Sequence, residues 1–158
     1  MQTFLPYSDF NKTAKCLDYK RLGKQRVETW QIYKALTEEE YGWKNHPIVR
    51  MWKGYETTLL CYGMVICKEW ISRGYKDNMF SKFLLEYMTL QKLDVVYELL
   101  KYLNNFGKCL KYPSWLGNKK FHASHRSNLL RKNKEYYSQF DWTEPDNLPY
   151  VWITGDKK

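Results

Sequence analysis

The sequence contains no long hydrophobic run and no apolar start. Its longest uncharged stretch within an apolar region, residues 57–67, is much shorter than the about 20 residues that a helix needs to cross a bilayer. The first ten residues, MQTFLPYSDF, have neither the basic start nor the apolar block of a signal peptide. These absences predict a protein that is neither secreted nor bound to a membrane.

Signature motifs of the common enzyme classes are also missing. The sequence has no glycine-rich phosphate loop, no dinucleotide-binding fingerprint, no nucleophile elbow and no H-E-x-x-H motif. Its four cysteines, Cys16, Cys61, Cys67 and Cys109, form no C-x-x-C pair, and clustered Cys and His ligands at zinc-site spacings are absent. We therefore expect reduced, mostly buried thiols and neither a metal site nor another cofactor.

Acidic residues are outnumbered by basic ones. The chain has 26 Lys and Arg against 17 Asp and Glu, which gives a net charge of +9 and an isoelectric point near 9.3. Aromatic residues make up 18% of the chain. Cations bind phosphates and aromatic rings stack on bases, so this composition favours a nucleic-acid partner, although most aromatic residues are also expected to build the core.

The pattern of apolar residues is typical of one mainly helical domain. We expect a first helix over about 8–19 with Ser8 as its N-cap, an interruption or bend at Gly23, and a continuation to about 36. Further helices are predicted over 47–73 with Gly74 as C-cap, over 80–106, over about 118–131 and, briefly, over 134–140. Strand candidates are confined to 4–5 and 150–153. The predicted fold is all-α, with a single domain over 1–150 and a C-terminal tail over 151–158.

The densest polar cluster spans residues 18–28, with the sequence DYKRLGKQRVE. On a continuous helix, Lys20, Arg21, Lys24 and Glu28 fall within a sector of roughly 100°. Closely spaced cations bind phosphate, and an acid among them is held ionised. The alternative is a solvated face with weak i,i+4 pairs.

A second polar cluster, HASHRS over residues 122–127, precedes Arg131. His122, His125 and Arg126 fall on one side of a helix, where such a strip can hold phosphates. A structural role in capping and surface hydrogen bonding is an equally good interpretation. Two histidines alone are a weak signal for a metal, because Zn²⁺ needs three or four ligands.

His46 opens a third cluster, in which Pro47 starts a helix and Arg50 follows. The dipole at a helix N-terminus disfavours the cationic imidazole, so His46 is a candidate neutral hydrogen-bond partner or base. A purely capping histidine is the competing interpretation.

Five segments carry a family resemblance: MQTFLPY, CLDYKRLGKQRVETWQI, GWKNHPIVRMWKGYE, CKEWISRGY and HASHRSNLLRK with a tyrosine pair after it. In this order they resemble the pyrimidine-dimer DNA glycosylase family, that of phage endonuclease V, and above all a branch with the MQTFLPY start and the LGKQRVE stretch. The resemblance covers most of the chain except residues 79–106, which have the character of a helical insertion.

The resemblance implies a compact all-helical domain with the endonuclease V fold that kinks duplex DNA, extrudes a base and cleaves the glycosidic bond. In the family's chemistry an N-terminal α-amine attacks C1′, a glutamate assists, and the resulting imine permits strand cleavage by β-elimination. An α-amine has a pKa near 8, so a fraction of it is neutral and nucleophilic at pH 7. Here the bulk of Gln2 normally prevents removal of the initiator Met, so the amine would be that of Met1. Arg21 stands where the family glutamate belongs, which leaves Asp18 and Glu28 as the nearby acids.

We therefore expect a DNA repair glycosylase, with AP-lyase activity where an imine forms, that acts as a monomer on pyrimidine-dimer-like or modified bases of double-stranded DNA. Its expected location is the cytoplasm with the nucleoid, or the nucleus or a viral factory in a eukaryotic or viral setting. The alternatives are a catalytically silent nucleic-acid-binding protein on the same scaffold, an acid-activated water in place of the amine, and another nucleotide-derived substrate. The candidate catalytic residues are Met1, Asp18, Glu28 and His46, and the candidate DNA-binding residues are Lys20, Arg21, Lys24, Arg26, Arg50, His122, His125, Arg126 and Arg131.

Overall fold

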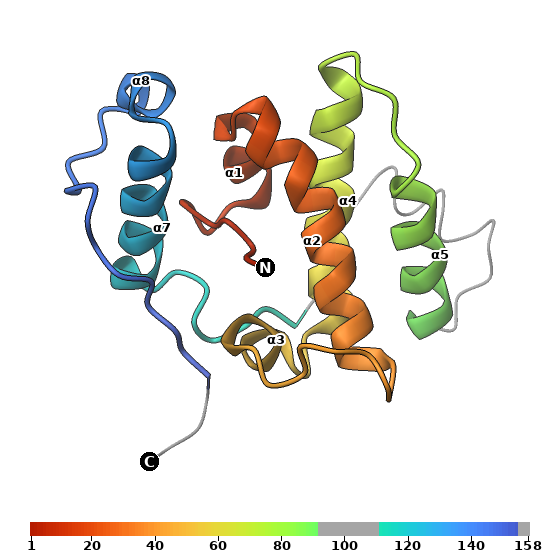
Figure 1. Ribbon diagram of the computed structural model, residues 1–158. Helices are drawn as coiled ribbons and strands as arrows, with labels where there is room; N and C mark the ends of the chain where they lie inside the picture. Colours follow the sequence, from red (N-terminus) through yellow and green to blue (C-terminus); the bar gives the residue numbers. More distant parts are fainter. Residues whose placement is uncertain (92–110, 155–158) are drawn as a thin grey trace.

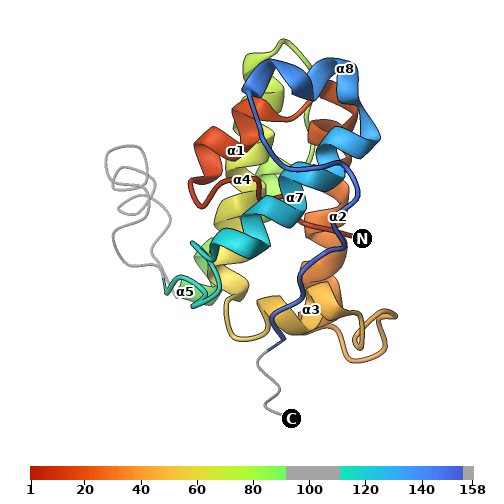
Figure 2. The ribbon, with the colours of Figure 1, turned by 90° about the vertical axis from the view of Figure 1, so that its left-hand side faces the viewer.

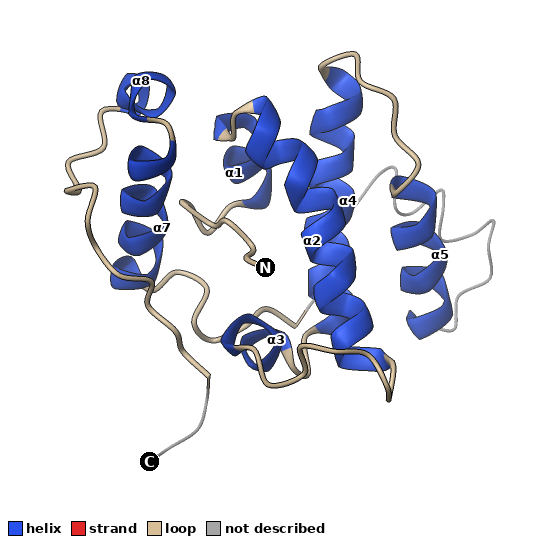
Figure 3. Ribbon diagram, viewed as in Figure 1, coloured by secondary structure: helices blue, strands red, loops and turns tan. Residues whose placement is uncertain are grey.

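The computed structural model describes residues 1–91 and 111–154, and every regular element within these two ranges is a helix (Figures 1 and 3). The helices are α1 (Phe10–Cys16), α2 (Tyr19–Thr37), α3 (Pro47–Trp52), α4 (Glu56–Ser72), α5 (Phe80–Gln91), α7 (Lys119–Lys132), α8 (Lys134–Tyr137) and the 3-10 helix η1 (Ser138–Phe140). The all-α prediction is confirmed. The two strand candidates are wrong, because residues 4–5 and 150–153 run extended without pairing as strands.

The central element is α4, which packs against α1, α2 and α5 (Figure 1). Its residues 58–67 are all buried, because this stretch is apolar on every side of the helix. The uncharged run of the sequence is therefore a core helix. In the described part of the chain, no helix combines the length and hydropathy that a membrane span requires.

The first predicted helix begins and ends elsewhere than expected. Asp9, not Ser8, is the N-cap of α1, and its carboxylate accepts a hydrogen bond from the Lys12 N–H. The chain then breaks at Leu17, and Asp18 caps the start of α2 by accepting from the Arg21 N–H at 2.9 Å. An aspartate in extended conformation satisfies the free N–H groups of a new helix, which is why the chain restarts there.

At two glycines the observed helices differ from the predicted ones. Helix α2 runs straight through Gly23, where a Cβ atom would lie 2.9 Å from the ring of Trp70, so this glycine permits close packing instead of a bend. The predicted helix over 47–73 is divided into α3 and α4 at Gly54, whose φ of 81° is favoured by glycine. Gly74, with a φ of 86°, follows the end of α4 as predicted.

The predicted insertion begins with α5, which packs on α4 (Figure 1). Gly63 of α4 lets the two helices approach, because a Cβ atom there would lie 2.5 Å from the ring of Phe83. The remainder of the prediction, from residue 92 to 106, lies outside the described residues, as does Cys109. The other three cysteines are free and buried, as expected.

Helix α7 lies on the opposite side of the molecule from α5, and the N-terminal segment, residues 1–6, runs between α7 and α2 (Figures 1 and 2). Asn118 caps α7 by accepting from the Phe121 N–H, close to the predicted start. The chain beyond η1 returns along α7, where the N–H of Val151 donates to Ser124 Oγ at 3.2 Å. The division into a domain over 1–150 and a tail from 151 stays a prediction.

Candidate active site

The N-terminal segment is anchored on α7 by two buried histidines that bind one residue. The N–H of Leu5 donates to Nδ1 of His125 at 3.2 Å, and the carbonyl of Leu5 lies 2.7 Å from Nδ1 of His122. Nε2 of His122 accepts from the Gly117 N–H, so its Nδ1 carries the proton, whereas Nδ1 of His125 is an acceptor. Both imidazoles are thus held neutral, in opposite tautomers.

Burial accounts for the electrostatic state of these histidines. It lowers the pKa of His122 below its ordinary value, and it lowers the pKa of the fully buried His125 to about 3. Both side chains point into the protein, where they position the N-terminal segment, and neither ring is exposed for the phosphate contact predicted for it.

On its other side the N-terminal segment is bound by α2 and α4. Gln25 of α2 accepts from the Phe4 N–H at 2.9 Å and donates to the Gln2 carbonyl at 2.8 Å. The hydroxyl of Tyr62 in α4 lies 2.8 Å from the Phe4 carbonyl. These contacts fix the backbone on both sides of Thr3, which directs the N-terminus toward the middle of α2.

The α-amine of Met1 reaches a carboxylate there. Its nitrogen lies 4.0 Å from Oε1 of Glu28, and both side chains are largely buried. Nζ of Lys24, one helical turn earlier, lies 3.5 Å from the same oxygen, and Nε2 of Gln25 donates to Oε2 at 3.1 Å. The structure thus brings Met1 and Glu28 together, and it joins Lys24 to them.

This pair lines a cavity of about 450 Å³ between the N-terminal segment, α2, the end of α7 and the C-terminal stretch. Cations dominate its lining, which consists of Met1, Gln2, Phe4, Lys20, Arg21, Lys24, Glu28, Lys132 and Tyr150. Burial raises the pKa of Tyr150 to about 12, so its hydroxyl remains a hydrogen-bond donor. Such a lining suits an anionic ligand that also carries hydrogen-bonding groups.

The lowered pKa of Lys132 reflects an excess of positive charge around this cavity. Partial burial lowers its pKa below the ordinary lysine value, and the charges of Arg21, Arg131 and Lys24 lower it further, while Glu28 opposes them. A bound phosphate group would relieve this repulsion.

Arg21 lines the edge of the cavity and binds Asp18 and the end of α7. Arg21 Nη1 lies 3.3 Å from Asp18 Oδ2, and Nη2 donates to the Lys132 carbonyl at 3.2 Å, which ties α2 to the end of α7. Asp18 itself is buried, caps α2 and is absent from the cavity lining. Of the two candidate acids, Glu28 alone therefore faces the amine.

His46 caps α3, with Nδ1 accepting from the Ile48 N–H at 3.2 Å. Burial lowers its pKa, the positive Met1 amine lowers it further, and Glu28 opposes both, so the ring lies within electrostatic reach of the pair. Nδ1 is used in capping, which leaves Nε2–H as a donor. The ring centroids of Trp43 and Trp152 lie 6.0 and 5.9 Å from that of His46.

The remaining predicted DNA contacts fall into two groups. Three arginines bind protein groups: Arg26 pairs with Asp77 at 2.5 Å, Arg126 pairs with Glu144 and also donates to the Pro6 carbonyl, and Arg131 donates to Asn128. Lys20, Lys24 and Arg50 have exposed side chains, Arg50 on α3. The first group stabilises the fold around the site, and the side chains of the second lie at the surface.

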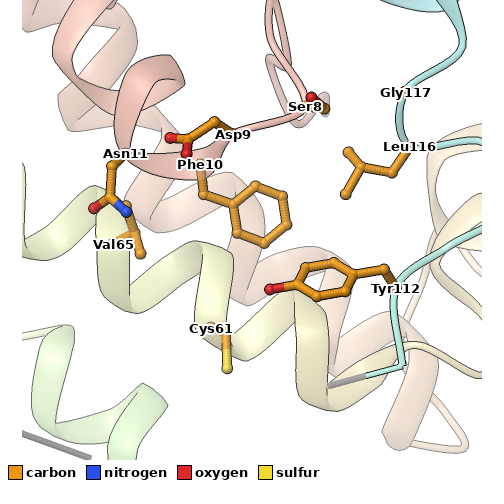
Figure 4. Close-up of a pocket in the computed structure, with 9 residues that line it drawn as sticks. All are labelled: Ser8, Asp9, Phe10, Asn11, Cys61, Val65, Tyr112, Leu116 and Gly117. Carbon is orange, nitrogen blue, oxygen red and sulfur yellow. The ribbon is translucent and has the colours of Figure 1, made fainter. Parts of the chain in front are cut away.

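A larger cavity, of about 620 Å³, lies between the start of α1, α4 and residues 112–117 (Figure 4). The rings of Phe10 and Tyr112 face each other across it, Cys61 also lines it, and none of its described lining residues is basic. Burial raises the pKa of Cys61 to about 12, so the thiol is protonated and a poor nucleophile at neutral pH. Of these two cavities, the smaller one therefore carries the basic lining.

Sequence reasoning missed three residues of the basic cavity and its supports: Gln25, Lys132 and Tyr150. Gln25 lies inside the quoted polar cluster and three residues before Glu28, a spacing that puts both side chains on one helix face. Lys132 directly follows the predicted Arg131. No local sequence pattern predicts that Tyr150 lines the cavity, because only the return of the chain along α7 brings it there.

Comparison with known proteins gives one match. A family model described as pyrimidine dimer DNA glycosylase matches residues 1–83, slightly more than half of the chain. The matched part includes the N-terminal segment and all of α2, and it ends before α7. Searches of curated proteins and of solved structures found no match.

Proposed function

The chain belongs to the pyrimidine dimer DNA glycosylase family, and from this premise we propose that it excises pyrimidine-dimer-like bases from double-stranded DNA with the Met1 α-amine as nucleophile. The observation that carries the proposal is the 4.0 Å approach of the Met1 nitrogen to Glu28 Oε1 in a cavity rimmed by cations. An amine, a carboxylate and a phosphate-binding rim are the groups that the family's chemistry requires.

In the proposed reaction the neutral amine attacks C1′ of the damaged nucleotide. A bond forms between the Met1 nitrogen and C1′, and the glycosidic bond breaks with its electron pair leaving on the base. The carboxylate of Glu28 stabilises the positive charge that develops on the sugar and can accept a proton from the attacking amine. The C1′–O4′ bond of the sugar then breaks, with a proton going to O4′, and this ring opening converts the adduct into an imine. Loss of a C2′ proton from the imine expels the 3′ phosphate, which is the AP-lyase step.

His46 has a supporting part in this proposal. Its Nδ1 accepts a hydrogen bond from the Ile48 N–H, and its lowered pKa keeps the ring uncharged. The ring therefore offers an Nε2–H donor and does not serve as the base. The neutral ring leaves the nearby amine without a further cationic neighbour, which favours the nucleophilic form of the amine.

DNA binding is proposed to run over the rim formed by Lys20, Lys24 and Lys132, with Arg50 beyond it. The first three line the cavity, and Lys24 is 72% exposed, so each can meet a backbone phosphate. Trp43, which is 66% exposed beside His46, offers a ring on which an unpaired base can stack.

The test uses a duplex that carries one thymine dimer, a duplex with one abasic site and an undamaged duplex. We expect cleavage of one glycosidic bond of the dimer in the first, whose detached base stays joined to its neighbour through the cyclobutane ring. We expect strand cleavage of the second, and a covalent adduct on Met1 when borohydride is present. An extension fused before Met1 removes the α-amine and should abolish the adduct and the cleavage. Glycosidic-bond cleavage that survives the extension would favour an acid-activated water, and inactivity with retained DNA affinity would favour the silent binding protein.

A further inference from the structure

We infer that Gln25 is a positioning residue that holds the Met1 amine and the Glu28 carboxylate together through a single amide group. The catalytic part of this inference rests on the proposed function. Its structural content is independent of it, because it follows from hydrogen bonds among buried groups.

The amide nitrogen of Gln25 has two hydrogens and uses both at the site. It donates to the Gln2 carbonyl at 2.8 Å and to Glu28 Oε2 at 3.1 Å. One –NH₂ group therefore connects the backbone next to the nucleophile with the acid. Gln25 is fully buried, so water does not compete for these bonds.

The amide oxygen fixes which way the group points. It accepts from the Phe4 N–H at 2.9 Å and lies 2.8 Å from the Tyr62 hydroxyl. The Tyr62 hydroxyl has one proton, which it shares between this oxygen and the Phe4 carbonyl. A flipped amide would place its oxygen against two acceptors, the Gln2 carbonyl and Glu28, so the observed orientation is the one that satisfies every group.

This arrangement gives the two oxygens of Glu28 different tasks. Oε2 is bound by Gln25, whereas Oε1 faces the Met1 amine at 4.0 Å and Lys24 at 3.5 Å. The carboxylate is thus oriented through one oxygen and acts through the other. Holding the Gln2 carbonyl also restricts the arc that the amine can reach, and such preorganisation lowers the barrier of a nucleophilic step.

Two substitutions of Gln25 test this role. Gln25→Met keeps the size of the side chain and removes every hydrogen bond. Gln25→Glu presents two acceptor oxygens to two acceptors while ionised, but its protonated form again has one donor and one acceptor. Burial and the neighbouring Glu28 raise the pKa of the introduced carboxyl, so it becomes protonated at mildly acidic pH.

The first measurement is kcat on the thymine-dimer duplex from pH 5 to pH 8, as the ratio of variant to unmodified protein at each pH. We expect Gln25→Met to lose about 100-fold at every pH, and Gln25→Glu to lose as much at pH 8 but to recover about 10-fold or more by pH 5. DNA affinity should change by less than about twofold, because the cationic rim is intact. Gln31→Glu, which adds the same charge to another face of α2, is the control and should keep a flat ratio.

The second measurement does not depend on turnover. Limiting acetic anhydride labels amines, and mass mapping reports the rate at Met1 relative to Lys82, which is exposed on α5. In Gln25→Met the N-terminus is released, so labelling of Met1 should rise at least about threefold, with an unchanged helical circular dichroism spectrum. Gln31→Glu should leave the labelling of Met1 as it is.

The outcomes separate the two proposals. If the unmodified protein turns over no damaged substrate but Met1 labelling still rises in Gln25→Met, the glycosylase proposal fails and Gln25 still positions the amine. Equal kcat and equal labelling in all proteins would overturn the role of Gln25 and leave the glycosylase intact. An equal loss at every pH in both Gln25 variants, with unchanged labelling of Met1, would also overturn it, because it would indicate a merely structural residue.

Discussion

Leu5 and His125 are 120 residues apart in the chain, and the backbone N–H of the first donates to Nδ1 of the second at 3.2 Å. Leu5 also offers its carbonyl to His122, so one residue sets the tautomer of two imidazoles. Neither ring can accept a proton without losing a bond: a proton on His125 Nδ1 would meet the Leu5 N–H, and one on His122 Nε2 would meet the Gly117 N–H.

This relationship predicts acid-sensitive stability. The pKa of His125 is about 3 in the folded protein and near 6.5 when unfolded, so the unfolded chain alone takes up the proton between these values. Above pH 6.5 the stabilisation is complete, and as the pH falls toward 3 we expect the free energy of unfolding to decrease by up to about 1.4 kcal/mol per pH unit from this residue. Urea unfolding at several pH values measures it.

His125→Gln provides the control, because an amide oxygen can accept the Leu5 N–H but does not titrate in this range. The variant should be less stable at pH 7, through lost packing on Phe121, and should show a shallower pH dependence. An unchanged slope would assign the acid sensitivity to other groups.

The two acids of α2 are expected to behave differently on substitution. Glu28→Gln removes the charge beside the Met1 amine and should lower kcat by about 100-fold or more, with unchanged or slightly tighter DNA binding. Asp18→Asn should retain activity within about threefold, because asparagine also caps a helix and Asp18 does not line the cavity. Single-turnover cleavage of a damaged duplex compares them, and a large loss in Asp18→Asn alone would reverse the assignment.

The cationic rim predicts a salt dependence of DNA binding. Replacing Lys20, Lys24 and Lys132 together with Ala should weaken binding and lower the slope of log K against log salt by about 2 to 3, since each phosphate contact contributes about 0.9. Lys82, Lys119 and Lys120 are exposed and outside the cavity lining, so their triple replacement makes the same charge change as a control. Equal slopes in the two triple variants would place the DNA elsewhere.

The close contact of α4 and α5 predicts a stability difference between two glycines. Gly63→Ala forces a methyl group against the ring of Phe83 and should destabilise the protein by about 1 to 3 kcal/mol. Gly42→Ala meets no atom within 4 Å and should change stability by less than about 0.5 kcal/mol. Thermal unfolding followed by circular dichroism compares them.

Helix identity could be predicted from the sequence because apolar periodicity is local. The expected helix over about 118–131 agrees with α7 to within one residue at each end. The breaks at Asp18 and Gly54 were missed because the apolar pattern continues across both, so only capping and backbone geometry mark them.

The site was predictable in part. Met1 and Glu28 were named from the sequence, although the acid stands seven residues after Arg21, the position where the family glutamate belongs. Seven residues are about two helical turns, so Glu28 lies on nearly the same face of α2, about 10 Å further along. The inward orientation of His122 and His125 depends on Leu5, and a contact across about 120 residues leaves no local pattern to detect.

The clasp of α7 on the N-terminal segment has a consequence for the order of events during synthesis. The N-terminal segment cannot form its contacts with α7 when it is first synthesised, because His122 and His125 are translated more than a hundred residues later. Until then Leu5 lacks its hydrogen bonds to α7, and the cavity lacks Lys132 and Tyr150. A nascent or truncated chain therefore cannot assemble the complete cavity, which forms only when contacts across more than a hundred residues close.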